Sequence, residues 1–579
     1  MDTSYRVVGK NAAAPFSLTI HRGDGMVLLS MDWRAGQPPR DFVGFAIQYR
    51  IPGDPRLFAV HNRIGFPGQE VPDDGIRSTE APIQKFRWVH FPFDAGLEGD
   101  FLYRVTAMFM NEDGSLRRGE AQEAELPLMR ETLPGKINVA FTRGFVSSQA
   151  FVRNFGADGS VETLVPPFGD DGLTFKSNRG DAETAYAWMG FEARKTIRSL
   201  LNLARDADVE VRAIGYDLNL PEIVEGFEAL GPKLKIIIDN SDRTEGHGRP
   251  KSPESTAAGR IETSAGGDHV KRQHMGNIQH HKSIAVRGGG IDTVIYGSTN
   301  LSWRGFYVQS NNALAVHSAD AVKDYFTAFD TYFAAKQASD FEDSESSSGW
   351  LDLKVDGVDA KVAFSPHSQA NGRLDEIGAD IDSATSTVFF SLAFLGQTTK
   401  GPIGPALGRS LDKPNLHVLG IADGEIHAKN LGLEVLTPDK KRHLVRPDAL
   451  MKDVPPPFVQ EPSGLDGHNG GVRMHHKFVV LDFNKPSARV YLGSYNFSVP
   501  ADQDNGENLV LVRDRTVATS YMIEALRMYD HYVFRLASHS DEPLALKLPP
   551  KDGKAPWFDR DWSDPVRARD RQLFAAVDV

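Results

Sequence analysis

The stretch that decides the fold is Met474-His475-His476-Lys477-Phe478-Val479-Val480-Leu481-Asp482, which is followed by Gly493-Ser494-Tyr495-Asn496. An earlier stretch has the same order: His280-His281-Lys282-Ser283-Ile284-Ala285-Val286 precedes Gly297-Ser298-Thr299-Asn300. Each copy reads His-x-Lys, an apolar run and Gly-Ser-x-Asn, and the His and Asn are 20 residues apart in the first copy and 21 in the second. This spacing predicts an internal duplication, with the shared site on the pseudo-twofold axis between its halves.

The composition limits the classes of protein to consider. The chain has 579 residues, 40% of them hydrophobic, enough for about three to four domains. It has no cysteine, which excludes disulfides, thiolate nucleophiles and Cys-ligated zinc. A net charge of −12 means that binding to nucleic acid or anionic membrane would need a local basic patch. With no long apolar run and no secretory signal pattern, we expect a soluble protein, either cytoplasmic or exported without a conventional amino-terminal signal.

The first fifth of the chain, residues 1–132, has the pattern of antiparallel strands. Apolar residues alternate in three runs: Val27, Leu29, Met31 and Trp33; Phe45, Ile47 and Tyr49; Tyr103, Val105, Ala107 and Phe109. Trp33 and the run Phe101 to Ala107 resemble the early Trp and the penultimate Tyr-x-Val-x-Ala strand of fibronectin type III domains. That resemblance implies an all-β immunoglobulin-like sandwich. We interpret its aromatic residues as core and the domain as a spacer or a docking module for a partner.

After Pro134-Gly135 the pattern becomes α/β, and its order occurs twice, over residues 133–345 and 346–540. In the first half we predict strands at 137–141, 209–216 and 234–238, helices at 184–205 and 318–337, a long polar loop at 240–276, and a linker at 341–349. In the second half we predict strands at 362–364, 388–394 and 416–421, a helical stripe of Leu374, Ile377, Ile381 and Ala384, a polar loop at 437–472 and a helix at 517–536. Residues 541–579 are expected to form a C-terminal extension that wraps over the surface or is partly disordered.

The motif residues alternate between the two faces of an extended segment. Residues two apart share a face, so His280 and Lys282 project together, as do His475 and Lys477. The intervening His281 and His476 point the other way, which favours a structural role. Asp482 lies on the face opposite the His-Lys pair, so we expect it to hold a loop. Arg287 stands at the corresponding position of the first copy.

The paired motifs resemble those of the phospholipase D superfamily, in which His-x-Lys-x4-Asp and Gly-Ser-x-Asn occur twice per active site. The resemblance covers about Ile137 to Ala537, some two thirds of the chain. It implies duplicated α/β halves that form one active site, and a chain that functions as a monomer. Arg287 departs from the pattern at a position that parity places outside the site.

Such a site suits a phosphodiester. Lys282, Lys477, Asn300 and Asn496 would supply charge and N–H donors to the non-bridging oxygens, with Ser298 and Ser494 in support. One histidine attacks phosphorus to give a phosphohistidine, and the other protonates the leaving oxygen and then activates water. We expect no metal and no cofactor, because the lysines supply the positive charge.

The residues eleven positions after each Asn distinguish the two histidines. They are Glu507 and Asn311. The resemblance implies that each reaches the histidine of the opposite half, so Glu507 would orient His280 and Asn311 would orient His475. A carboxylate raises the basicity of an imidazole, whereas an amide only orients it. We therefore assign His280 as the nucleophile and His475 as the general acid/base.

Other features support no firm role. His247, His269 and His274 are irregularly spaced on the polar loop, so we interpret them as surface or substrate contacts rather than zinc ligands. Two basic clusters, Lys271-Arg272 and Lys440-Lys441-Arg442, could attract a phosphate. The segments 394–407 and 455–459 could contact acyl chains or be plain loops.

The leading functional hypothesis is hydrolysis or transfer of a phospholipid headgroup, with contact to a membrane surface. The main alternative is a nucleic-acid phosphodiesterase, an endonuclease with the same two-histidine chemistry. A third possibility is a catalytically idle scaffold that binds a partner through the β-sandwich. Both intact His-Lys pairs argue against the scaffold.

Overall fold

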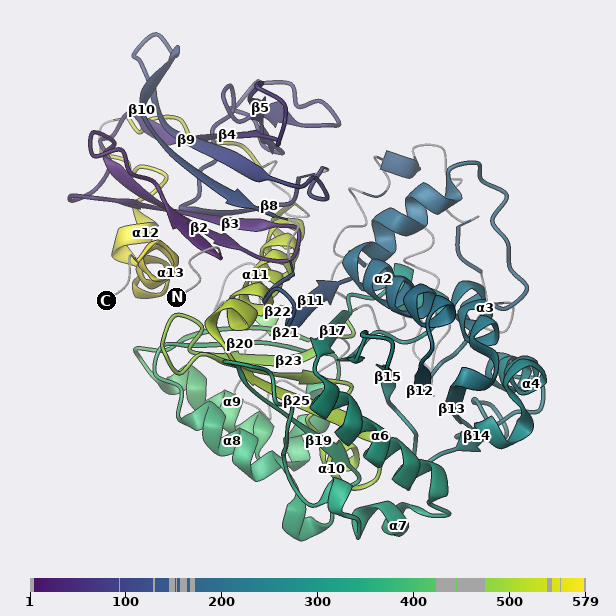
Figure 1. Ribbon diagram of the computed structural model, residues 1–579. Coiled ribbons are helices and arrows are strands. Elements are labelled where there is room, and N and C mark those ends of the chain that lie inside the picture. The colour runs from purple at the N-terminus through teal and green to yellow at the C-terminus, as the bar shows by residue number, and fades with distance from the viewer. Residues whose placement is uncertain are drawn as a thin grey trace. The chain divides into compact units, whose positions relative to one another are not determined.

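The structure is a computed structural model, and it describes residues 5–92, 94–128, 131–144, 151, 154–156, 164–166, 172–422, 444–445, 474–538, 544–551 and 553–576. The cluster Lys440-Lys441-Arg442 and the segment 455–459 lie outside the described residues, as does nearly all of the loop 437–472. The fold is mixed α/β with several sheets (Figure 1). It divides into two compact units: Met1–Arg130 with Thr519–Arg527 and Phe534–Val579, and Glu131–Ala518 with Met528–Val533.

The first unit contains two four-stranded antiparallel sheets. One has the order β1(Arg6–Val8), β2(Phe16–Arg22), β3(Val27–Trp33), β8(Arg87–His90). The other has the order β10(Leu116–Pro127), β9(Asp100–Met110), β4(Phe42–Arg50), β5(Phe58–Ala59), and a ribbon of β6(His61–Asn62) and β7(Ile76–Arg77) accompanies them. The three alternating runs found in the sequence face one hydrophobic core between these sheets, with Trp33 and Tyr49 at its margin.

The C-terminal segment belongs to this same unit. It carries the short helix α12(Arg560–Ser563) and α13(Pro565–Ala575). Phe558, only 1% exposed, lies in the core between the sheets, where its ring is 6.0 Å from that of Phe42. Trp557 stacks on Phe86 at 5.3 Å, and His21 Nε2 hydrogen-bonds the Phe574 carbonyl at 2.8 Å. Residues that the sequence pattern assigned to a surface extension therefore complete the core of the first unit.

The second unit contains two larger mixed sheets. The first has the order β11(Ile137–Phe141), β17(Asn312–His317), β16(Thr293–Gly297), β15(Lys282–Arg287), β12(Glu210–Gly215), β13(Leu234–Asp239), β14(Val270–Gln273). The second has the order β18(Leu351–Asp352), β19(Asp359–Ser365), β25(Glu507–Arg513), β24(Arg489–Gly493), β23(Lys477–Leu481), β20(Thr387–Leu392), β21(His417–Ala422), β22(Leu444–Val445). Apart from β18, the two sheets have the same sequence of pairings, antiparallel from the first strand to β12 or β20 and parallel beyond it.

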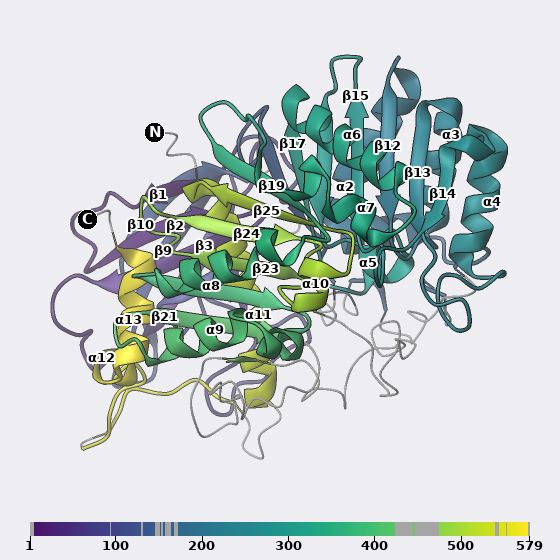
Figure 2. The ribbon, with the colours of Figure 1, turned by 90° about the horizontal axis from the view of Figure 1, so that it is seen from below.

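Helices cover these sheets. The first half has α2(Ala182–Asp206), α3(Pro221–Leu230), α4(Pro253–Ala265), α5(Trp303–Tyr307), α6(Ala319–Ala334) and α7(Ala338–Glu342); the second has α8(Leu374–Asp382), α9(Ile403–Asp412) and α10(Val499–Gln503). A further helix, α11(Arg515–Ser538), contains residues of both units. Helices α8 and α9 lie side by side on the second sheet (Figure 2), and the predicted stripe Leu374, Ile377, Ile381 and Ala384 packs into its core. In the described part of the chain, no helix is long and apolar enough to cross a bilayer.

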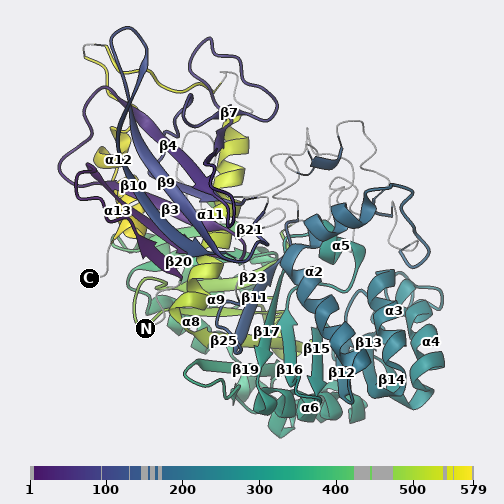
Figure 3. The ribbon, with the colours of Figure 1, turned by 45° about the horizontal axis from the view of Figure 1, so that its top comes forward.

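Two predictions about loops were wrong. The stretch 240–276 contains a full helix, α4, beside α3 and next to the edge of the sheet (Figure 3), followed by β14. This helix begins where the Ser252 hydroxyl accepts a hydrogen bond from the Ser255 N–H and Pro253 occupies the first turn. The expected linker 341–349 is also packed, because Phe341 is buried against Tyr332 with ring centroids 3.7 Å apart.

Candidate active site

Each motif histidine is held at the junction of the two sheets by backbone from the opposite half. Gln279 forms a parallel bridge with Gly506, and Met474 forms one with Ser310. The His280 N–H donates to Gly506 O at 2.8 Å, and the His475 N–H donates to Ser310 O at 3.1 Å. These reciprocal bonds bring the two imidazoles to a centroid separation of 6.5 Å.

The two histidines have different partners on Nδ1. His280 Nδ1 lies 2.9 and 2.8 Å from the two carboxylate oxygens of Glu507. His475 Nδ1 lies 2.9 Å from Asn311 Oδ1 and 3.1 Å from the Ser298 carbonyl. Since carbonyl and carboxylate oxygens only accept, both rings donate from Nδ1 and leave Nε2 free for chemistry.

The two lysines begin the central strands and are buried beside these rings. Lys282 Nζ donates to His280 O at 2.5 Å and lies 4.6 Å from the Tyr216 ring. Lys477 Nζ donates to His475 O at 2.8 Å and lies 5.5 Å from the Phe394 ring. Both lysines were expected from their motifs, whereas Tyr216 was not, because an aromatic residue after a buried strand has the pattern of ordinary core.

Burial sets the electrostatics of the site. It lowers the pKa of His280 and of His475 well below the usual value, and the charges of Lys282 and Lys477 lower both further. Burial also lowers the pKa of Lys282 to about 7 and that of Lys477 well below its usual value. It raises the pKa of Glu507 to about 7, although the charge of Lys282 opposes this. The centre therefore favours neutral imidazoles, and an anionic ligand beside the two lysines would favour their charged forms.

The Gly-Ser-x-Asn residues line the same centre. The Ser298 hydroxyl donates to Asn311 Oδ1 at 2.9 Å, and the Ser494 hydroxyl accepts from the Asn508 N–H at 3.0 Å and hydrogen-bonds Glu507. Asn300 Nδ2 donates to Asp217 Oδ2 at 3.2 Å. The Oδ1 atoms of Asn300 and Asn496 are buried and have no hydrogen-bond partner among the described residues. These two amides remain able to bind a further group.

The intervening histidines, His281 and His476, bond to residues of the opposite half other than Glu507 and Asn311. His281 Nδ1 lies 3.2 Å from Asn508 Nδ2, and His476 Nδ1 lies 3.2 Å from Asn312 Nδ2. The other nitrogen of His281 lies 3.2 Å from the Tyr332 hydroxyl. Full burial lowers the pKa of His281 to about 3, so it is neutral at physiological pH. This arrangement agrees with a structural role for both residues.

Asp482 also lies outside the reacting set. It has a left-handed φ of 51°, and its carboxylate accepts N–H bonds from Thr385, Ser386 and Thr387 at 2.7 to 3.2 Å. It therefore holds the turn that leads into β20. In the first half, Arg287 pairs with Glu210 and lies 4.3 Å from the Phe326 ring.

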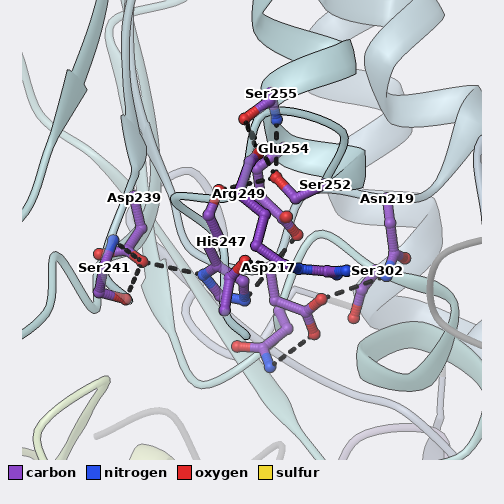
Figure 4. Close-up of polar contacts among 12 residues, drawn as sticks. Asp217, Asn219, Asp239, Ser241, His247, Arg249, Ser252, Glu254, Ser255 and Ser302 are labelled. Atoms are coloured by element: carbon purple, nitrogen blue, oxygen red, sulfur yellow. Dashed lines mark hydrogen bonds and ion pairs between the residues drawn. The ribbon is translucent and has the colours of Figure 1, made fainter. Parts of the chain in front are cut away.

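The three loop histidines have separate surroundings. His269 Nδ1 bonds the Leu234 carbonyl at 2.9 Å, and His274 Nδ1 bonds the Met275 carbonyl at 2.8 Å. His247 instead lies among acidic residues, with Nδ1 2.9 Å from Asp239 (Figure 4). Its ring is 4.5 Å from that of Tyr216, which is also 4.8 Å from His280.

No family model matches the chain. Over 48 residues, 8% of this chain, it is 44% identical to a phospholipase D of Rickettsia prowazekii (strain Madrid E) and covers 22% of that protein. Over 59 residues, 10% of this chain, it is 39% identical to the mitochondrial cardiolipin hydrolase of Xenopus tropicalis and covers 26% of it. The chain thus spans about a quarter of the length of these curated relatives.

Solved structures show a more extended but weaker likeness. Phosphatidylserine synthase of Haemophilus influenzae Rd KW20 aligns over 66% of this chain and 93% of that one, with a TM-score of 0.40 and 11% identity. The sequence matches cover short regions at modest identity. They point to the class of phospholipase D-type phosphodiesterases.

Proposed function

We propose that this chain is a phosphodiesterase of the phospholipase D type, which hydrolyses or transfers a phospholipid headgroup through a phosphohistidine. The observation that carries the proposal is the pair of imidazoles 6.5 Å apart, each with a buried lysine two residues along and a different acceptor on Nδ1. This constellation supplies a nucleophile, an acid and positive charge without a metal in the reacting set.

In the first step, His280 Nε2 attacks phosphorus and the bond to the leaving oxygen breaks. Glu507 accepts the Nδ1–H of His280, which fixes the tautomer and stabilises the positive charge that develops on the ring. Lys282, Lys477, Asn300 and Asn496 would bind the non-bridging oxygens. The Nδ2 groups of the two asparagines would donate to these oxygens; one N–H of Asn300 already goes to Asp217, and its second N–H would serve the ligand.

His475 acts as the general acid and then as the base. Its Nε2 proton goes to the leaving oxygen, and neutral His475 then removes a proton from water, whose oxygen displaces His280 from phosphorus. Burial and the lysines lower the pKa of free His475. A bound phosphodiester anion offsets the lysine charges, which raises that pKa and allows His475 to carry the proton.

We also propose that the chain is built from two duplicated halves. We interpret residues 133–345 and 346–540 as duplicated halves, supported by the common strand order of the two large sheets and the reciprocal histidine contacts. One chain then holds both halves of one site and functions as a monomer. We interpret the two small sheets of residues 1–132 as an immunoglobulin-like sandwich of the fibronectin type III kind, with a docking role.

Phospholipid is the favoured substrate because the net charge of −12 disfavours a polyanion and because both curated relatives named above are called lipid hydrolases. A nucleic-acid phosphodiesterase would use the same residues and is the second candidate. An idle scaffold is disfavoured by the intact set of His, Lys, Asn and Glu.

One experiment separates the three. The purified protein is incubated with phosphatidylcholine vesicles and separately with plasmid DNA, each with and without chelator. The active-site variant is His280→Ala, and the control is His274→Gln, a loop histidine whose Nδ1 hydrogen-bonds the neighbouring Met275 carbonyl. Choline release lost in His280→Ala and kept in His274→Gln supports the lipase. DNA nicking with the same dependence supports the nuclease, and no turnover across a broad panel of phosphodiesters contradicts both.

A further inference from the structure

A second cluster of ionisable side chains lies beside the catalytic pair. Asp217 follows β12, His247 lies in the loop after β13, and Glu254 lies in the first turn of α4 (Figure 4). One ligand atom from each of these three residues lies within 4.8 Å of the others. Glu254 is 2% exposed, and Asp217 and His247 are half-buried.

Asp239 fixes the orientation of the imidazole. Its Oδ2 accepts from His247 Nδ1 at 2.9 Å and also from the Ser241 hydroxyl, while its Oδ1 accepts from the Gln279 N–H at 2.7 Å. Nδ1 is therefore the protonated nitrogen, and Nε2 is directed to the acidic side, 3.8 Å from Glu254 Oε1. A carboxylate that holds one nitrogen of a histidine while the other faces further carboxylates is the arrangement of histidine metal ligands.

The charges in the cluster favour a cation. Three carboxylates, those of Asp217, Asp239 and Glu254, surround the one imidazole of His247. Arg272 contributes charge, but it donates to Ser255 Oγ and to the carbonyls of Asp239 and His247 rather than to a carboxylate of the cluster. Arg249 is drawn in the same loop (Figure 4), and its Nε donates to the Gly246 carbonyl.

An independent observation comes from Asn300. Its Nδ2 donates to Asp217 Oδ2 at 3.2 Å, while Oδ1 of the same amide, on a residue only 4% exposed, has no partner among the described residues. A buried amide oxygen without a partner normally has a ligand, water or ion to satisfy it. This one belongs to the amide that contacts the acidic cluster.

We infer that Asp217, His247 and Glu254 bind a divalent transition-metal ion of the Zn²⁺ or Mn²⁺ type, with Asp239 positioning the imidazole. One imidazole with carboxylates suits these ions better than Mg²⁺ or Ca²⁺, which prefer oxygen ligands only. Binding at about 2.0–2.2 Å would draw the three ligand atoms to about 3.3 Å from one another. The three ligand atoms now lie within 4.8 Å of one another, so rotation of the side chains would bring them to this distance.

The location gives such an ion an effect on catalysis, a consequence that rests on the proposed function. Asp217 holds Asn300, and the Tyr216 ring touches both His247 and His280. An ion on Asp217 would therefore fix the position of Asn300 beside the phosphate without touching the reacting atoms.

The test measures ion binding directly. Full-length protein, stripped with chelator, is titrated with Zn²⁺ and with Mn²⁺ by calorimetry, and bound Mn²⁺ is counted by electron paramagnetic resonance. We expect about one ion per chain, and binding at least 10-fold weaker in His247→Gln and in Glu254→Gln. Asp239→Asn should weaken it by about 10- to 100-fold. The His274→Gln control should bind as the parent protein does.

Absence of stoichiometric binding to the parent protein would overturn the inference, as would equal affinity in His247→Gln, Glu254→Gln and the parent. Circular dichroism of each variant separates lost binding from lost folding. His280→Ala should keep the ion while losing turnover. The metal site and the phosphodiesterase proposal can therefore fail independently.

Discussion

The Glu507 carboxylate contacts Nδ1 of His280 at 2.8 Å across the junction of the two large sheets, although the residues are 227 positions apart in the chain. The matching position in the other half is an amide, Asn311, on His475. This asymmetry gives the two otherwise equivalent histidines different basicities. It is the physical basis for assigning His280 as the nucleophile.

Replacing Glu507 should therefore impair turnover more than replacing Asn311. We expect Glu507→Gln to lower kcat by about 10³- to 10⁴-fold, because the amide can present the wrong tautomer and cannot stabilise the charged ring. Asn311→Ala should cost only about 10-fold, because the Ser298 carbonyl still accepts from His475. Steady-state kinetics on a soluble phosphodiester measure both. A larger loss in Asn311→Ala would reverse the assignment of the two histidines.

The covalent intermediate should form on His280. His475→Ala removes both the acid that protonates the leaving group and the base that activates water. With a substrate whose activated leaving group needs no acid, the phosphohistidine should form and then accumulate. Rapid quenching at alkaline pH followed by mass spectrometry of peptides locates it. His280→Ala serves as the control and should give no adduct. Recovery of the adduct on His475 in the parent protein would contradict the assignment.

Much of this site could be predicted because its signals are local and repeated. The parity of His280 and Lys282, and of His475 and Lys477, follows from extended backbone alone. The contact between Glu507 and His280 followed from family resemblance, since no local pattern connects residues so far apart. Asp482 was expected on the opposite face of the strand for the same reason, and its carboxylate binds three backbone N–H groups.

Two features, helix α4 and the acidic cluster, were not predicted from the sequence because they depend on tertiary packing. Helix α4 buries mainly small side chains such as Ala257, Ala258 and Ala265, so its apolar periodicity is weak. The start Ser252-Pro253 is the local signal that could have predicted it. The acidic cluster combines an aspartate after one strand with a histidine and a glutamate from a loop and a helix, at spacings without a motif. Only the folded chain brings them together.

Removing the Asp482 carboxylate should affect stability rather than chemistry. Asp482→Ala orphans the N–H groups of Thr385, Ser386 and Thr387, so we expect a loss of about 2–4 kcal/mol in the free energy of unfolding. Asp482→Asn keeps one acceptor and tolerates the left-handed backbone, so its loss should be smaller. Denaturant titration measures both. The kcat of the folded fraction should stay within about threefold, and a larger fall would place Asp482 in the site.

The C-terminal segment should be required for the stability of the first unit. Phe558→Ala removes a ring from the core between the two small sheets, so we expect a loss of about 3–5 kcal/mol. Val566→Ala, at a side chain of the same segment that is 37% exposed, is the matched control and should change stability by about 0.5 kcal/mol or less. Thermal unfolding compares the two variants. Equal and small effects would mean that the segment is a dispensable extension.

The buried lysines Lys282 and Lys477 should lower the stability of the fold that holds them. Burial lowers the pKa of Lys282 to about 7, from about 10.5 when exposed, so the folded state resists its protonation. The resulting cost is fully present below pH 7 and fades as the pH rises toward about 10.5. Lys282→Met should therefore raise the free energy of unfolding by about 1–4 kcal/mol at pH 6 while abolishing turnover.

The gain in the free energy of unfolding from Lys282→Met should be smaller at pH 9, because at that pH both the parent and the variant are neutral at this position when folded. Denaturant titrations at the two pH values measure it. Lys323→Met, at an exposed lysine of α6, controls for the added hydrophobic side chain and should show no such pH dependence. If the Lys282→Met protein were less stable than the parent at pH 6, the expectation would be contradicted. Lys282 would then be paired well enough in the empty site to offset its desolvation. The site would have no unbalanced positive charge for an anionic substrate to stabilise.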